Sequence, residues 1–151
     1  MEKINNELND LLYLIPPKLS VKEISNTSPL LLAFIGDAVH TLFVRSYFLK
    51  NSADTTPNKQ HKSCSGLCRA EAQSQALGFI TPLLDANELD VARRARNSKN
   101  HSGSKNTSVE DYKKATAFEA LVGFLYLTGQ NKRLENLLLN FYKNAEKKIE
   151  K

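Results

Sequence analysis

Hydrophobic residues recur along most of this chain at intervals of three or four, which is the spacing of amphipathic α-helices. The pattern predicts a short helix near residues 4–14, ended by a Pro-Pro pair, and then a loop with one turn around residues 21–24. A longer apolar run opens at Pro29 and predicts a buried helix over residues 30–49. The first third of the chain is therefore expected to be helical.

Capping signals mark two further helices in the middle of the chain. Thr56 is suited to cap a helix that has Pro57 at its first position and runs to about Gly78. The segment 85–98 predicts another helix, which leads into a loop rich in glycine, serine and asparagine.

Two helices are predicted in the last third. Thr107 or Ser108 caps the first, an acidic residue three positions later completes a capping box, and the apolar pattern continues to about residue 129. Asn131 caps the second, and no segment shows the alternation of a strand. We therefore expect one all-α domain over residues 1–151, with a last helix that buries Leu134, Leu137, Leu138 and Phe141.

Composition narrows the class of protein. The chain is 41% apolar over 151 residues, which is enough for a core, and its two cysteines do not suggest a secreted disulfide framework. The N-terminal segment lacks the features of a signal peptide. The run over residues 30–49 has the length of a membrane span, but Asp37, His40 and Arg45 interrupt it. We expect a cytoplasmic protein that does not enter the membrane.

Two carboxylates stand out because each lies alone in an apolar helical run. Asp37 interrupts "LLLAFIGDAVHTLFV", and Glu119 is the one charged residue of "ATAFEALVGFLYLTG". Most residues three or four positions away from either carboxylate are small, which leaves room beside them. Two such groups could share a hard divalent cation such as Mg²⁺, which prefers oxygen ligands. Alternatively, a helix N-terminus or Arg45 satisfies Asp37, and Glu119 points to solvent.

The net charge of +5 is concentrated in one segment. Residues 91–109 carry five basic side chains and no acidic one, and in the rest of the chain the two signs are equal in number. A solvated helix end and loop would explain such a cluster, but its short polar residues also suit phosphate binding.

Two long sequence strings resemble the ribonuclease III family. "LLLAFIGDAVHTLFVRSYFL" is similar to the signature helix of the family's catalytic domain, and "ATAFEALVGFLYL" is similar to its second metal-binding helix. The strings "PNKQHKS" and "RRARNSK" and the short chain look like the Mini-ribonuclease III subfamily, which lacks a double-stranded-RNA-binding domain. The resemblance covers most of residues 28–145 and implies that family's helical, dimeric fold.

The resemblance also implies the chemistry of the site. It makes Asp37 and Glu119 the catalytic, metal-binding acids of a Mg²⁺-dependent endonuclease that leaves 5′-phosphate and 3′-hydroxyl ends. Full-length relatives carry two more acids, at the positions where this chain has Ala33 and Thr116. Mini-type enzymes share this reduced set of acids, so the number of ions is left open.

Substrate and partners are implied in the same way. The expected substrate is double-stranded RNA, specifically precursor 23S ribosomal RNA. The expected partners are a second copy of the chain and a ribosomal protein or pre-ribosomal particle. The subunit interface would involve the helix of Asp37 near Phe34 or Leu42. The residues expected to bind RNA are Arg93, Arg94, Arg96, Asn97, Lys99, Lys105 and Asn106.

Other interpretations remain open at this point. A catalytically silent RNA-binding or ribosome-assembly module could keep the same fold, and a helical protein-interaction domain could carry the same basic surface. His61, Cys64 and Cys68 share one helix face, but three ligands on one helix rise too far to surround a zinc ion compactly. His40 is expected to pack rather than to assist Asp37.

Overall fold

The computed structural model describes residues 18–51, 53, 56–99 and 107–149, with the side chains described as far as residue 145. The helix predicted near residues 4–14 lies outside this part of the chain. Within the described residues there is no strand, which agrees with the all-α prediction. The elements are α2 Val21–Ser25, α3 Pro29–Asn51, α4 Pro57–Cys68, α5 Ala70–Ile80, the 3₁₀ turn η1 Thr81–Leu83, α6 Ala86–Arg96, α7 Val109–Leu127 and α8 Asn131–Ile149.

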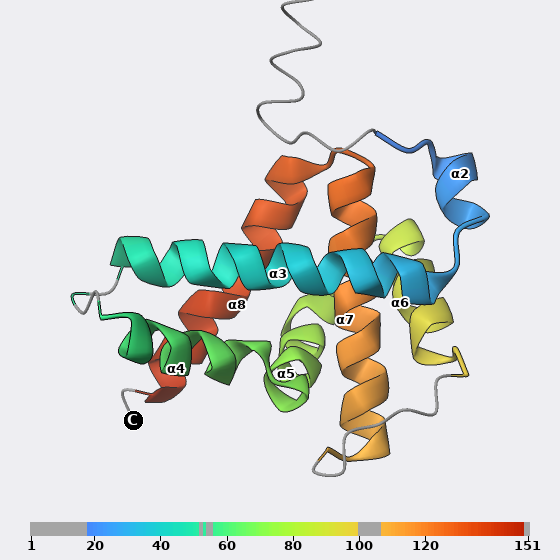
Figure 1. Cartoon of the computed structure of the whole chain (residues 1–151). Coiled ribbons are helices and arrows are strands. Elements are labelled where there is room, and N and C mark those ends of the chain that lie inside the picture. Colours follow the sequence, from blue (N-terminus) through green and yellow to red (C-terminus); the bar gives the residue numbers. More distant parts are fainter. Residues whose placement is uncertain (1–17, 52, 54–55, 100–106, 150–151) are drawn as a thin grey trace, which may run out of the picture.

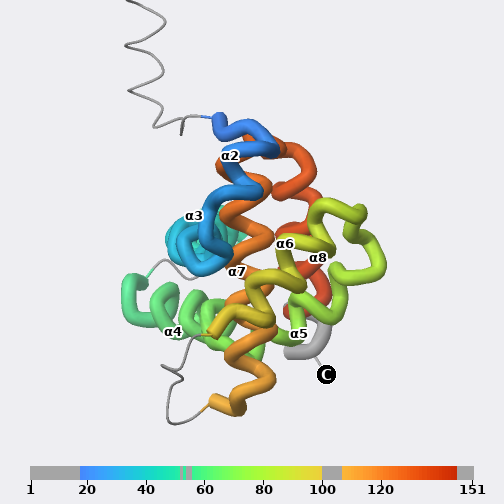
Figure 2. The backbone as a smooth tube through the Cα atoms, turned by 90° about the vertical axis from the view of Figure 1, so that its right-hand side faces the viewer, coloured from blue at the N-terminus to red at the C-terminus, as the bar shows by residue number. Residues whose placement is uncertain are grey.

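Helix α7 is the centre of the fold. It is apolar on nearly every side, as expected for a helix surrounded by others, and ten of its residues are buried. Helices α3, α5 and α6 pack against it, and α3 crosses it on one face (Figure 1). The view along α3 in Figure 2 places α7 beside it and α8 farther back. The positions of α3, α5 and α6 are therefore set by their contacts with α7.

The helix predicted from Pro57 to Gly78 is two helices, so that prediction is wrong at Arg69. Arg69 has an extended backbone (φ −71°, ψ 150°) and separates α4 from α5. No glycine or proline marks the break, because the cause is tertiary: α4 packs against α3, whereas α5 packs against α7. One straight helix cannot make both contacts.

The predicted N-caps are partly confirmed. The Ser108 hydroxyl accepts a hydrogen bond from the Asp111 amide at 3.1 Å and donates one to the Asp111 carboxylate at 2.8 Å. Thr56 occupies the cap position of α4 without a capping hydrogen bond from its side chain. Helix α8 begins at Asn131, and the carbonyl of Gln130 accepts from Leu134, so the predicted cap is wrong by one residue.

A buried ion pair that the sequence pattern did not indicate joins α6 to α8. Glu88 is 1% exposed, and its two carboxylate oxygens accept from Nε and Nη2 of Arg133, both at 3.0 Å. The same guanidinium donates to the carbonyl of Leu83 in η1. A buried carboxylate requires such a partner, so this pair fixes the position of α8 against α6 and η1.

The prediction that α3 is a buried helix is only half right. Among the described helices it is the one long and apolar enough to cross a bilayer. One face packs into the core through residues that include Leu32, Gly36 and Val44, while Asp37 and Arg45 lie on exposed positions. The apolar run therefore reflects a helix with a core face and a second apolar face that is exposed.

Candidate active site

Two glycines allow α3 and α7 to touch through their backbones. A Cβ atom added to Gly36 would lie 1.7 Å from the carbonyl oxygen of Glu119, and one added to Gly123 would lie 2.0 Å from the carbonyl oxygen of Leu32. No larger residue fits at either position without moving a helix backbone. The small residues near the two carboxylates thus serve the helix crossing.

The crossing brings Asp37 and Glu119 together. Asp37 follows Gly36 on α3, and the backbone of Glu119 is the part of α7 that Gly36 contacts. The Asp37 carboxyl is exposed and the Glu119 carboxyl is half-buried, so the pair lies at the edge of the core and is open to solvent. Neither carboxylate forms an ion pair among the described residues. An Arg45 partner for Asp37 is therefore not supported, and the half-buried Glu119 does not project fully into solvent.

The two carboxylates repel each other when both are ionised. Burial, together with repulsion from Asp37, raises the pKa of Glu119 from 4.5 to about 7, although Gln73 opposes this shift. A divalent cation between the carboxylates would remove the repulsion. The oxygen donors present suit a hard cation such as Mg²⁺.

The described protein donors to such an ion are few. No group of three or more His, Cys, Asp or Glu side chains gathers anywhere in the described residues. Ala33 is buried, and the Thr116 hydroxyl donates to the carbonyl of Tyr112 at 3.0 Å. Two carboxylates supply few of the ligands that Mg²⁺ takes, so an ion held by them would keep most of its coordination positions for water and substrate oxygens.

His40 is a structural residue, as expected. It is fully buried, its Nε2 lies 3.2 Å from the carbonyl of Leu67 at the end of α4, and its Nδ1 lies 3.4 Å from the Tyr142 hydroxyl. Carbonyls in the last turn of a helix lack helical donors, so Nε2–H satisfies one of them. Burial lowers the pKa of His40, which keeps the ring neutral.

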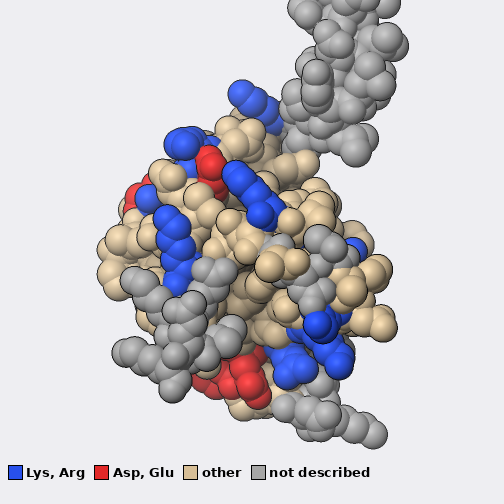
Figure 3. All heavy atoms as spheres, turned by 90° about the vertical axis from the view of Figure 1, so that its left-hand side faces the viewer, with Lys and Arg blue, Asp and Glu red and all other residues tan. Residues whose placement is uncertain are grey.

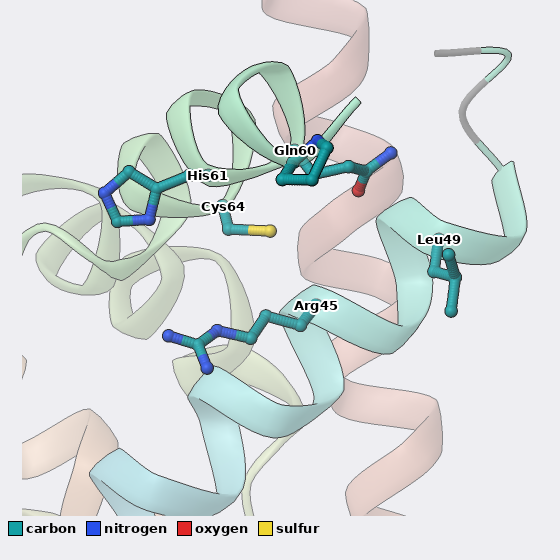
Figure 4. Close-up of a pocket in the computed structure, with 6 residues that line it drawn as sticks. Arg45, Leu49, Gln60, His61 and Cys64 are labelled. Carbon is teal, nitrogen blue, oxygen red and sulfur yellow. The ribbon is translucent and has the colours of Figure 1, made fainter. Parts of the chain in front are cut away.

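The cysteines also have the packing role that was expected. Cys64 is buried, Cys68 is half-buried, and burial raises the pKa of both thiols. His61 and Cys64 line a cavity of about 350 Å³ between α3 and α4, toward which Arg45 extends (Figure 4). This cavity begins two helical turns after Asp37 and is separate from the carboxylate pair.

The expected RNA-binding arginines of α6 bond to three different parts of the protein. Arg93 pairs with Asp90 at 2.6 Å, Arg96 pairs with Glu110 of α7, and the Arg94 guanidinium donates to the carbonyl of Ser25 at 3.3 Å. Asn97 caps the C-terminus of α6, and Lys99 is exposed. Lys105 and Asn106 lie outside the described residues.

Basic side chains are also present elsewhere on the surface. On the face shown in Figure 3, lysine and arginine side chains form separate groups on a largely uncharged surface. The described lysine and arginine side chains on this face therefore do not form one continuous basic patch.

Comparison with known proteins decides the family. The pattern of the Ribonuclease III domain matches residues 30–130, a span that contains both carboxylates. The chain belongs to the ribonuclease III family. Membership in this family makes it an endoribonuclease, as the resemblance of the two helices implied.

Relatives in the ribonuclease III family match over most of their length. The chain is 37% identical over 136 residues to a Mini-ribonuclease 3 of Clostridium tetani, a match that covers 88% of this chain and 90% of the relative. It is 43% identical to a Mini-ribonuclease 3 of Brevibacillus brevis, over 74% and 83% of the two chains. The crystal structure of a protein from Fusobacterium nucleatum superposes with a TM-score of 0.73 at 30% identity, over 82% of this chain and 98% of that one.

The raised pKa of Glu119 makes stability depend on pH. The unfolded carboxyl titrates near 4.5 and the folded one near 7, so between these values the folded protein binds more protons and stability falls as pH rises. In a chelating buffer, Glu119→Gln should therefore gain stability over the wild type as pH rises from 4.5 to 8. Urea unfolding at both pH values measures this difference, with exposed Glu135→Gln as the control. Parallel pH dependences of the wild type and Glu119→Gln would contradict it.

Proposed function

We propose that this chain is a Mg²⁺-dependent endoribonuclease that cleaves double-stranded RNA, with Asp37 and Glu119 as its catalytic, metal-binding residues. The observation that supports the proposal is the interaction of Asp37 with Glu119 beside the contact of α3 with α7 at Gly36 and Gly123, at an edge that is open to solvent. Their residue types and separate helices match the two family strings in the sequence.

The chemistry follows from a carboxylate pair that holds a cation next to a phosphodiester. A Mg²⁺ ion held by Asp37 and Glu119 would make a bound water more acidic and would neutralise charge on the phosphoryl oxygens. Asp37 and Glu119 would hold the cation in place, and no side-chain nucleophile is required. Water attacks phosphorus in line with the departing 3′-oxygen, so the products carry 5′-phosphate and 3′-hydroxyl ends. Because Ala33 and Thr116 replace two acids of full-length relatives, RNA phosphates would complete the coordination.

The C-terminal end of α6 and the segment after it form the proposed RNA-binding surface. Double-stranded RNA is recognised mainly through phosphates and 2′-hydroxyls, which suits arginine, lysine and asparagine side chains. The ion pairs of Arg93 and Arg96 are exposed and therefore weak, so phosphates can replace Asp90 and Glu110 as partners. The proposed set is Arg93, Arg94, Arg96, Asn97, Lys99, Lys105 and Asn106.

A homodimer is proposed because two strands require two sites. The second apolar face of α3 exposes Leu31, Phe34, Leu42 and Leu49, and Phe34 and Leu42 are 75% and 65% exposed. These positions recur at helical spacing, and a second copy of α3 would cover them. Because Asp37 lies on the same helix, the two active sites would face one groove.

The biological substrate is the most specific part of the proposal. The curated relatives are named Mini-ribonuclease 3, and the subfamily resemblance makes precursor 23S ribosomal RNA in the cytoplasm the proposed substrate. A ribosomal protein or pre-ribosomal particle would present this RNA. A catalytically silent module would not need both carboxylates at the helix crossing, so retention of the pair favours the enzyme.

Cleavage of an end-labelled RNA duplex by the purified chain tests the proposal. With Mg²⁺ we expect cuts in both strands, with 5′-phosphate ends, and with EDTA we expect none. A single strand of the same sequence is the matched control and should remain largely intact. Binding of a precursor ribosomal RNA stem without cleavage in Mg²⁺ would favour the silent module instead.

A further inference from the structure

Gln73 of α5 is a buried polar residue that the core does not account for. Its side chain is 2% exposed, and its Nε2 is the one buried side-chain nitrogen or oxygen in the described residues that has no hydrogen-bond partner. Buried amides in folded proteins normally find partners, because an unmade hydrogen bond costs free energy. Such an unpaired donor next to a candidate active site requires an explanation.

The neighbour that matters is Glu119. Helix α5 packs along α7, and the Gln73 side chain lies close to the Glu119 carboxyl, on which its amide can act as a hydrogen-bond donor. Of the two side chains beside Glu119, Gln73 is buried and Asp37 is exposed.

We propose that Gln73 is a positioning residue, which donates Nε2–H to one oxygen of Glu119 and leaves the other oxygen directed at the divalent cation. This inference rests on the proposed function of the carboxylate pair. Carboxylates that bind metals are commonly held by hydrogen bonds from neighbouring side chains, which fix their orientation. The site has few protein ligands, so the orientation of each one matters more. The unpaired amide is then a donor that completes its hydrogen bond to Glu119 when that carboxylate is turned toward the ion.

Apolar substitutions at position 73 separate a positioning role of the amide from a purely structural one. Methionine has nearly the same length and no polar atoms to satisfy, so Gln73→Met should keep or raise the thermal midpoint in EDTA. Gln75 on the same helix is exposed, so Gln75→Met is the matched control. Gln73→Leu is a second apolar replacement for the case that Gln73→Met does not fold.

The experiment measures Mg²⁺ binding by calorimetry and the Mg²⁺ dependence of duplex cleavage for these variants. We expect Gln73→Met to weaken Mg²⁺ affinity by roughly 10–100-fold and to raise the Mg²⁺ concentration for half-maximal cleavage in parallel. The KM for duplex at saturating Mg²⁺ should not change, and Gln75→Met should match the wild type.

The failures are distinguishable. Wild-type Mg²⁺ affinity in a folded Gln73 variant would overturn the inference and leave the proposed function intact. Loss of stability in EDTA with unchanged Mg²⁺ affinity would also overturn it, because Gln73 would then be structural. A wild-type protein that neither binds Mg²⁺ nor cleaves duplex would overturn the proposed function, and the role of Gln73 with it.

Discussion

Gly36→Ala is expected to destabilise the protein by roughly 3 kcal/mol and to abolish the carboxylate site in the molecules that remain folded. The added methyl group would lie 1.7 Å from the carbonyl oxygen of Glu119, which is a backbone atom in the middle of α7. No side-chain rotation relieves this overlap, so α3 and α7 must separate. Separation exposes core residues of both helices and increases the distance from Asp37 to Glu119.

Gly78→Ala is the matched control for this substitution. Gly78 is a helical, exposed glycine with nothing within 4 Å of an added Cβ. Alanine is the better helix former, so this variant should gain up to about 1 kcal/mol. Urea unfolding of both variants measures the difference. Equal stability of the two variants would show that the helix crossing is not as close as described.

Asp37→Asn is expected to reduce duplex cleavage by about 10³-fold or more while RNA binding is retained. The change keeps the shape of the side chain and removes the charge that is proposed to hold a cation at the phosphodiester. Because the Asp37 side chain is exposed, its loss should leave the thermal midpoint nearly unchanged. Single-turnover cleavage and duplex affinity should be measured together, with Glu135→Gln on α8 as the control. Cleavage within tenfold of the wild type would exclude Asp37 from the catalytic machinery.

Much of the fold could be predicted because the helices carry strong local signals. Ser108 at a cap and Pro29 and Pro57 at helix starts gave boundaries that match the structure closely. The closeness of Asp37 and Glu119 also had a signal in the sequence, because each is the single acid of an apolar run, although their role as a site stays a prediction.

What the sequence pattern missed depends on contacts between distant elements. The break at Arg69 arises from two packing partners, and the Glu88–Arg133 pair joins residues 45 positions apart. The exposure of Asp37 depends on which face of α3 turns toward α7, and an apolar run without clear amphipathicity does not specify that face. Gln73 lacked a signal of its own, since a glutamine side chain is usually exposed.

The central claim is that Asp37 and Glu119 form one cation site. The most direct measurement is Mg²⁺ binding and duplex cleavage for the wild type, Asp37→Asn, Glu119→Gln and the double variant, arranged as a double-mutant cycle. If the two residues act as a unit, each single variant loses nearly all binding and cleavage, and the double variant is no worse than either. Multiplicative losses, or a single variant that keeps wild-type Mg²⁺ affinity, would contradict the claim.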